Sequence, residues 1–366
     1  TNADDSSVID SSKISSTTIQ TAVAAATDIS TWLKNFTALF ATGMPSEAQL
    51  SASGLLDTSA HFMDMGQSYD QFSGEVITMG DLVGMAITNS AITFTNPEQT
   101  IARVSTQMNL KDGSTETWDF QLEKQWDGTW KYVGDQRIAD IEFEALAVNN
   151  VNLANGASSM YSGLHLWLDA EDYNANANLN TTDTLEPIAY AVVTGPGLPT
   201  AGVKMIQQSQ NAYFTVEGNN WGNQVPDCNY QNTIAAACVT IADTVDNGAY
   251  TVRLFSASHA ALNGSGYVVK LDSPKPLASS DLSSSMFQTI TSMTVNGIAL
   301  TDLSQFISTD TTLGVTWTLP AGMTNEDIKA SGWSSGVRTV SVGEDLTEAQ
   351  THASLALGAT SSATSA

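Results

Sequence analysis

The spacing of apolar residues changes once along this chain, from a helical period to a β period, and this change constrains the fold most. Apolar side chains recur every three or four residues from Ile19 to Phe40, which predicts a helix of about six turns over residues 17–40. Ser46 with Glu47 predicts the start of a second helix. Alternation then replaces this period and predicts four strands, at residues 85–94, 99–110, 115–125 and 129–136.

The turns between these strands indicate antiparallel pairing. Lys111-Asp112-Gly113 and Asp127-Gly128 each separate two alternating segments, and Asp-Gly between such segments is a strong hairpin signal. Trp118 and Phe120 alternate with polar neighbours, so one face of their strand is expected to be buried. Helices followed by an antiparallel meander predict an α+β domain over residues 17–138, preceded by a polar arm at 1–16.

This order of elements resembles the nuclear transport factor two-like, cone-shaped α+β family. The resemblance is carried by Leu55-Leu56-Asp57, by Phe62-Met63-Asp64-Met65-Gly66 and by the closing hairpin from Leu122 to Asp135, and it covers about a third of the chain. It implies a cone with an apolar pocket, at whose mouth enzymes of this fold commonly place an Asp or an Asp/His pair.

Pocket candidates follow from the resemblance and from the pattern of aromatic residues. His61 with Asp57 or Asp64 could supply a general base. Packing in a core explains the spacing of the aromatic residues with no further assumption and is preferred, and a histidine beside a helix end is more often a plain surface residue. The pocket candidates are Trp32, Phe36, Phe62, Trp118, Trp130, Tyr132, His61 and Asp64.

Beyond residue 138 the texture changes to short β runs separated by Gly, Pro and Asn turns, which predicts all-β sandwich modules. We expect one β-sandwich-like domain at 139–287 and a second at 288–366 that ends in a polar tail. The first includes expected strands at 138–148, 164–168, 188–193, 212–216, 233–241, 250–255 and 267–271.

Two phrases resemble known sandwich families. Gly248-Ala249-Tyr250-Thr251-Val252 resembles an immunoglobulin-like strand in which the tyrosine closes a loop through its hydroxyl. Val315-Thr316-Trp317-Thr318-Leu319-Pro320 resembles a fibronectin type III-like strand with a core tryptophan. The fold class expected for the whole chain is therefore an α+β cone domain followed by all-β sandwich modules, multidomain and dominated by β-structure.

The charge of the chain excludes some partners. Only 14% of the residues are charged, and 13 Lys and Arg face 38 Asp and Glu, for a net charge of −25. Nucleic acid is not expected as a partner, because its phosphates would be repelled and no basic cluster is present. No apolar run is long enough for a membrane span. The chain begins at Thr1 rather than Met, which is typical of a processed export product, so we expect a secreted or cell-surface location.

The two cysteines, Cys228 and Cys238, predict one disulfide that closes a short loop in an oxidising compartment, with two buried free thiols as the alternative. Asp169, Glu171 and Asp172 could offer oxygens to calcium, but they lack the spacing of a dedicated loop, so a solvated acidic turn is preferred. Trp221 or Trp333 could stack on a sugar. No catalytic, metal or cofactor motif is found, so we expect no cofactor and no enzyme.

Three functions remain open at this point. The first is an extracellular structural protein that associates with copies of itself, as a surface layer or filament, through its terminal arms and β modules. The second is a secreted protein that binds a small apolar ligand or a glycan in the cone pocket or on sandwich loops. The third is a cone-fold enzyme with a His/Asp base.

Overall fold

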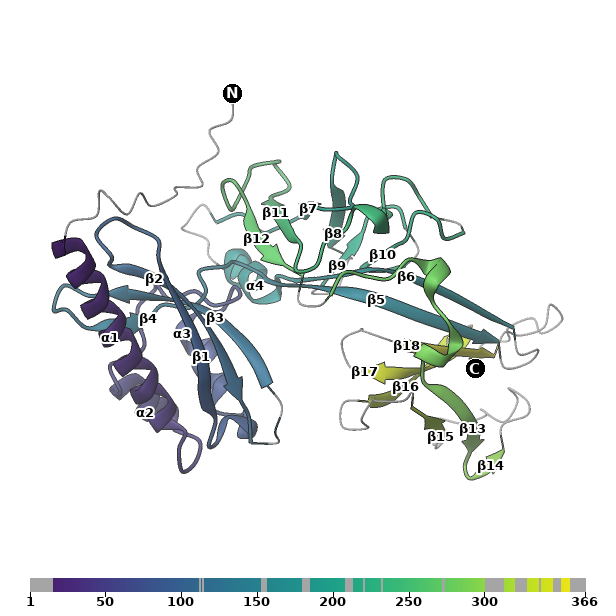
Figure 1. The fold of residues 1–366 in the computed structure, drawn as a ribbon, viewed down its shortest axis with the longest axis horizontal. Coiled ribbons are helices and arrows are strands. Elements are labelled where there is room, and N and C mark those ends of the chain that lie inside the picture. Colours follow the sequence, from purple (N-terminus) through teal and green to yellow (C-terminus); the bar gives the residue numbers. More distant parts are fainter. Residues whose placement is uncertain are drawn as a thin grey trace. The chain divides into compact units, whose positions relative to one another are not determined.

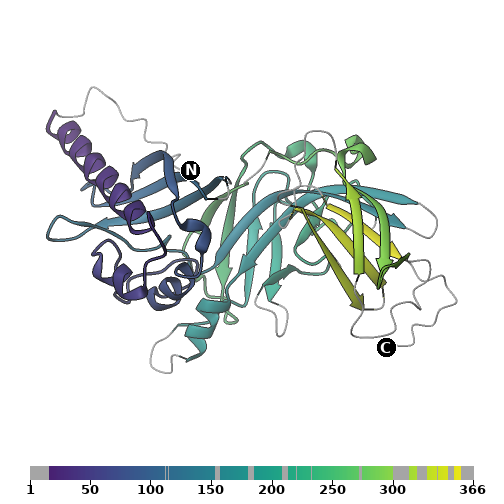
Figure 2. The same cartoon turned by 90° about the horizontal axis from the view of Figure 1, so that it is seen from below.

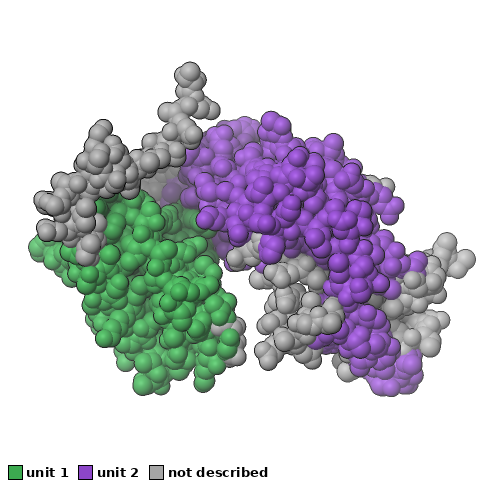
Figure 3. Space-filling view, viewed as in Figure 1, with its two compact units in different colours: residues 1–139 green, residues 140–366 purple. Residues whose placement is uncertain are grey.

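The computed structural model divides the chain into two compact units, residues 1–139 and 140–366 (Figure 3). Antiparallel sheets dominate both, with few helices (Figures 1 and 2). The structure describes residues 16–355 except 112, 114, 153–156, 180–184, 208–212, 220, 232, 272–273, 300–312, 320–327, 336 and 345–349.

Three helices and one 3₁₀ turn open the first unit, and the first two helices confirm those expected at residues 17–40 and from Ser46 on. Ser46 and Ser68 each cap a helix, because each hydroxyl accepts a hydrogen bond from the third residue on while that residue's Gln side chain reaches back. The elements are α1 (Ser16–Leu39), α2 (Glu47–Ala52), α3 (Tyr69–Val76) and η1 (Gly80–Leu82).

A four-stranded antiparallel sheet completes this unit, in the order β1-β2-β3-β4. One face packs on α1, where Ile29 and Phe40 are fully buried together with Phe120 of β3. The edge at β4 is covered by the chain before it, since Tyr132 N donates to Leu55 O at 2.8 Å. The strands are β1 (Ala86–Phe94), β2 (Ile101–Asn109), β3 (Thr115–Lys124) and β4 (Trp130–Tyr132).

The second unit is built mainly from three sheets, of orders β10-β6-β5-β18-β17-β16, β12-β11-β7-β8-β9 and β14-β13-β15. Its main elements are β5 (Asp140–Asn152), β6 (Ser158–Asp169), α4 (Glu171–Leu179), β7 (Tyr190–Thr194), β8 (Val203–Gln207), β9 (Phe214–Val216), β10 (Gln224–Pro226), β11 (Ala249–Phe255), β12 (Tyr267–Lys270), β13 (Thr289–Val295), β14 (Ile298–Ala299), β15 (Leu313–Thr318), β16 (Ile328–Ser335), β17 (Val337–Glu344) and β18 (Gln350–Leu355). Short 3₁₀ turns lie at Ile241–Asp243, Ser279–Asp281 and Ser284–Met286.

The five-stranded sheet and the first halves of β5 and β6 enclose one hydrophobic core, here called the sandwich core. Isolated bridges Phe143↔Leu271 and Asp169↔Tyr213 join the two sheets at both sides. Inward side chains are almost fully buried, and Phe143 meets Tyr250 edge to face at 5.8 Å between ring centroids. A β-sandwich-like architecture is therefore present, as expected for this part of the chain.

Tyr250 closes a loop through its hydroxyl, which confirms the expectation from its sequence context. The hydroxyl donates to Pro196 O at 3.1 Å. Gly195 beside it has no room for a side chain, because a Cβ there would fall on the Tyr250 ring. Burial and this closed surrounding raise the pKa of Tyr250 to about 12.

The long strands β5 and β6 continue beyond the sandwich core. There β18 pairs in parallel with β5, from Gln350↔Val148 to Ser354↔Asn152. The second unit thus contains both ranges expected as separate domains, 139–287 and 288–366, and the boundary between them stays a prediction. Residues 1–15 of the expected arm and residues 356–366 of the tail lie outside the described residues.

Two local expectations are wrong. Residues 233–241, expected as a strand, contain none. They form an irregular segment with a turn and one isolated bridge at Val239. Helix α4 was not expected, because its sequence EDYNANANL lacks an apolar period. Among its described residues Tyr173, Asn174 and Ala177 are buried, and the Asn174 side chain accepts from Ile188 N at 2.7 Å, a contact with a residue 14 positions along the chain.

Candidate functional site

The six aromatic pocket candidates lie in one hydrophobic core beneath α1. Five are almost fully buried, at 4% exposure or less, and Trp118 is half-buried. Their rings contact one another: the centroids of Trp32 and Phe36 are 5.0 Å apart, and those of Phe62 and Tyr132 5.3 Å. Mutual packing therefore accounts for the spacing that the sequence shows.

Two polar atoms inside this core stand out. Among the described residues, Trp130 Nε1 and the Tyr132 hydroxyl are buried without a hydrogen-bonding partner. Burial raises the pKa of Tyr132 well above its usual range, and the charge of nearby Asp64 adds to the effect.

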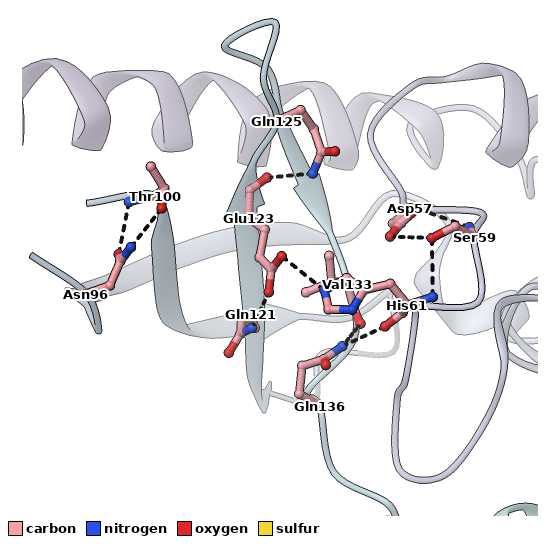
Figure 4. Close-up of polar contacts among 10 residues, drawn as sticks. All are labelled: Asp57, Ser59, His61, Asn96, Thr100, Gln121, Glu123, Gln125, Val133 and Gln136. Atoms are coloured by element: carbon pink, nitrogen blue, oxygen red, sulfur yellow. Dashed lines mark hydrogen bonds and ion pairs between the residues drawn. The ribbon is translucent and has the colours of Figure 1, made fainter. Parts of the chain in front are cut away.

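His61 does not pair with the carboxylates that the sequence proposed for it. Its Nε2 lies 3.0 Å from Glu123 Oε2, and Gln121 Nε2 donates to the other oxygen of Glu123 at 2.8 Å (Figure 4). The imidazole side chain is 52% exposed, so solvent rather than a closed substrate site surrounds it. Sequence reasoning missed Glu123, because only the pairing of β3 with β4 brings it to this loop.

Asp57 has a local role instead. Its carboxylate accepts from the backbone N and the hydroxyl of Ser59, both at 3.0 Å, and the Ser59 hydroxyl accepts from His61 N at 3.2 Å (Figure 4). Such an Asx turn needs no ligand to explain it. The arrangement holds the loop that presents His61.

Asp64 belongs to a buried junction between the loop at 62–67 and the end of the sheet. Its Oδ1 accepts from Asp135 N at 2.8 Å. Asp135 Oδ1 in turn accepts from Met65 N at 3.0 Å and from Arg137 N at 2.7 Å. Burial raises the pKa of Asp135, while these hydrogen bonds and the positive charges of Arg137 and Arg103 oppose that shift. The junction is a structural clamp that the sequence did not reveal.

The acidic residues proposed for calcium serve a helix start. Asp169 Oδ1 accepts from Glu171 N at 2.8 Å, and Glu171 with Asp172 forms the first turn of α4, where negative charge is favourable. No group of three metal-ligating side chains occurs in the described part of the chain. The sequence predicted a solvated acidic turn here, and the structure shows that these residues begin a helix instead.

Cys228 and Cys238 form a disulfide, which confirms the sequence prediction. The loop that they close is also anchored by Asp227, a fully buried carboxylate that accepts from Asn229 N at 3.0 Å and from Ser279 N at 3.2 Å. A disulfide is compatible with an extracellular protein.

An aromatic cluster lies on β6 and the loops beside β10. Tyr161, Trp221 and Tyr230 contact one another at ring-centroid distances of 5.0, 4.9 and 5.8 Å, and Trp221 and Tyr230 are partly exposed. Hydroxyl and amide groups border them, since Tyr161 donates to Gln224 Oε1 at 2.7 Å and Tyr230 to Ser159 Oγ at 3.3 Å. The side chain of Trp333, the other proposed sugar-stacking residue, lies outside the described part.

The open edge of the first sheet is the most unusual surface of that unit. β1 pairs only with β2, from Ala86↔Asn109 to Phe94↔Ala102, and its sequence AITNSAITF has neither charge nor proline. Within the described residues its other side makes no backbone hydrogen bond. Sequence reasoning found the strand but not that it ends the sheet.

Comparison with known proteins gives no match to a family model, a curated protein or a solved structure. None of the described helices is both long and apolar enough to cross a membrane.

Proposed function

We propose that this chain is an extracellular structural protein that associates with copies of itself through the open edge of β1. The observation that carries the proposal is the composition of that edge. An exposed strand edge is a template for another strand, and proteins usually protect it with lysine, proline, bulges or a covering segment. β1 has one irregularity, between Ile87 and Asn89, and six regularly paired, uncharged residues beyond it, from Asn89 to Phe94.

The surroundings of the edge support strand addition between copies. Antiparallel pairing of β1 with β1 of a second chain would satisfy backbone groups on both chains and is self-complementary about a two-fold axis. The outward face at Ala91 and Thr93 is exposed and uncharged, so little charge would be desolvated.

The finer identities belong to this proposal. A long helix on one face of a four-stranded antiparallel sheet supports a nuclear transport factor two-like first domain. The sandwich core and the Tyr250 loop closure support immunoglobulin- or fibronectin type III-like modules. The disulfide and the low content of charge support a secreted or cell-surface location.

Lysines on the edge test the proposal. We expect wild-type protein in about 0.5 M salt, where charge contacts are screened to a few ångströms, to sediment as a dimer. Asn89→Lys/Ala91→Lys is expected to sediment as a monomer, because pairing would have to desolvate two strongly hydrated lysines on the edge strand, a cost that salt does not remove. Analytical ultracentrifugation measures both.

The neighbouring strand provides a matched control. Gln107 and Ser105 face Asn89 and Ala91 across the β1–β2 ladder and are also exposed, but they lie on an interior strand. Gln107→Lys/Ser105→Lys adds the same charge to the same face and is expected to remain a dimer. A monomeric wild type, or equal behaviour of the two double variants, would refute the edge contact.

A second function, glycan binding, is favoured by the partly exposed rings of Trp221 and Tyr230 beside hydroxyl and amide groups. Aromatic rings stack on the apolar faces of sugars, while the polar neighbours can bond their hydroxyls. We expect a panel of neutral oligosaccharides to include one whose affinity falls about tenfold or more in Trp221→Ala. Trp126→Ala, which removes another exposed tryptophan, should keep that affinity in calorimetric titrations; equal losses would contradict a site at Trp221.

A further inference from the structure

The outward face of the five-stranded sheet gathers most of the positive charge of its region. Only four Lys and Arg occur between residues 140 and 287, against fourteen Asp and Glu. Three of the four, Lys204, Arg253 and Lys270, are at outward positions of β8, β11 and β12. We call this surface the basic face. The carboxylate of Glu217 reduces the positive charge of the basic face, because its Oε1 lies 2.8 Å from Lys204 Nζ.

Two of the three cations of the basic face, Lys204 and Arg253, lie over aromatic rings. Lys204, Val192 and Arg253 form one row across β8, β7 and β11, and Ile206, Tyr190 and Phe255 form the next. Tyr190 stacks on Phe255 with centroids 4.9 Å apart; Lys204 Nζ lies 5.1 Å from the Tyr190 centroid and Arg253 Cζ 5.0 Å from that of Phe255. Rings restrict these long side chains, so ordering them for a partner costs less entropy.

The opposite side of the same sandwich core has the reverse charge. Asp140, Glu142 and Glu144 alternate along β5 with the inward Ile141 and Phe143, and so point away from the core. Across the ladder, Asp169 is paired with Asp140 and Trp167 with Glu142. We call this surface, with its four carboxylates, the acidic face.

The acidic face also contains a stacked aromatic pair. Trp167 lies 5.8 Å from Tyr213 with an interplanar angle of 20°, and Trp167 Nε1 donates to Asp140 Oδ2 at 3.2 Å. Glu144 lies 3.8 Å from the buried His165. Both faces therefore combine ordered charges with flat aromatic surface, and they differ in the sign of the charge.

We propose that the acidic face of one copy docks on the basic face of a second copy. The inference deepens the proposed self-association and rests on it. Because the two faces lie on opposite sides of one core, the contact is heterologous, and each added chain presents a new free face, so it builds an open row. Combined with the two-fold β1 contact, it would extend dimers into a layer or filament.

Charge explains why the partner is another copy. Molecules with a net charge of −25 repel one another as a whole, yet at about 0.15 M salt this repulsion is screened beyond roughly 8 Å, while facing charges a few ångströms apart still attract. Opposed patches also select the register of docking more than they add affinity. The row is expected to form at this salt concentration and to dissociate at about 0.5 M.

The test uses full-length protein with the β1 edge blocked by Asn89→Lys/Ala91→Lys, so that failure of the edge contact does not obscure the result. In this background we expect concentration-dependent rows at 0.15 M salt by light scattering and electron microscopy. Arg253→Glu should raise the dissociation constant roughly tenfold or more. Lys275→Glu, off the basic face, gives the same change in net charge and should leave the constant unchanged.

A mixing experiment identifies the two faces independently of the exact register. Glu142→Arg weakens only the acidic face and Arg253→Glu only the basic face, so each alone should be largely monomeric. Mixed in equal amounts they retain one intact face each, and we expect discrete pairs but no rows. Circular dichroism checks folding, and both substituted side chains are exposed. Each of three results would overturn the inference: rows that persist in Arg253→Glu, an equal loss of affinity in Lys275→Glu, or an edge-blocked chain that is monomeric at every concentration. None of them bears on the β1 dimer of the proposed function, which is tested separately by sedimentation at about 0.5 M salt.

Discussion

Gly134→Ala is expected to destabilise the first unit by about 3 kcal/mol or more, because two penalties coincide at this residue. Its φ of +88° is one that L-residues rarely adopt, and a Cβ there would fall on the carbonyl oxygen of Met63. That carbonyl is part of the junction, since it accepts from Gln136 N at 2.9 Å. The backbone would have to move and break the pairing of the loop with the end of the sheet.

Gly128→Ala separates the two penalties. Gly128 has the same φ of +88°, but a Cβ there would meet no atom within 4 Å. Only the conformational cost remains, about 1–2 kcal/mol. The urea dependence of hydrogen–deuterium exchange in β2 and β3 measures the stability of this unit; equal losses in both variants would show that the approach of Met63 is not what excludes a side chain at 134.

Asp135→Ala is expected to cost about 3 kcal/mol, because it leaves the buried N–H groups of Met65 and Arg137 without an acceptor. Asp135→Asn keeps an acceptor oxygen and should cost much less. Asp127→Ala is the exposed counterpart: Asp127 also accepts from a backbone N and a hydroxyl, both of Thr129, but water can replace it. Asp127→Ala should therefore lower the free energy of unfolding clearly less than Asp135→Ala does, by the same exchange measurement.

The pH dependence of the Asp135 pair has a definite sign. Burial raises the pKa of Asp135 in the folded chain above its unfolded value. The stabilising effect of this carboxyl is therefore complete below the unfolded pKa, about 3.9, and decreases as pH rises through the folded pKa. Relative to Asp135→Asn, which does not titrate, the wild type should lose stability as the pH rises above about 4. If the wild type instead gained stability relative to Asp135→Asn as the pH rises, the hydrogen bonds to the carboxylate would outweigh its desolvation.

Local sequence signals predicted the parts of the fold that depend on residues close together in the chain. The helical period predicted α1 within one or two residues, and the Asp-Gly turns predicted the β3–β4 hairpin, because period and turn preference depend on neighbours along the chain. The Cys228–Cys238 disulfide and the Tyr250 loop closure were likewise predicted, since each involves a short loop or a recognisable phrase. Helix α4 was missed because it has no apolar period.

The partners of the candidate site residues were beyond such signals. Asp57 and Asp64, its neighbours in sequence, were the partners considered for His61 as a general base, with a plain surface histidine preferred; His61 lies against Glu123, 62 residues away. The same holds for the two charged faces, whose charged residues come from five strands and share a face only through register.

The sequence by itself determined the order of helices and strands in the first unit, the acidic and charge-poor composition and the disulfide. Only the tertiary structure decided which strand ends the sheet, which carboxylate meets His61 and which side of the sandwich collects the few cations. The physical reason is that side-chain period and turn preference are local properties of the chain, whereas strand order and register arise from contacts between residues far apart in sequence.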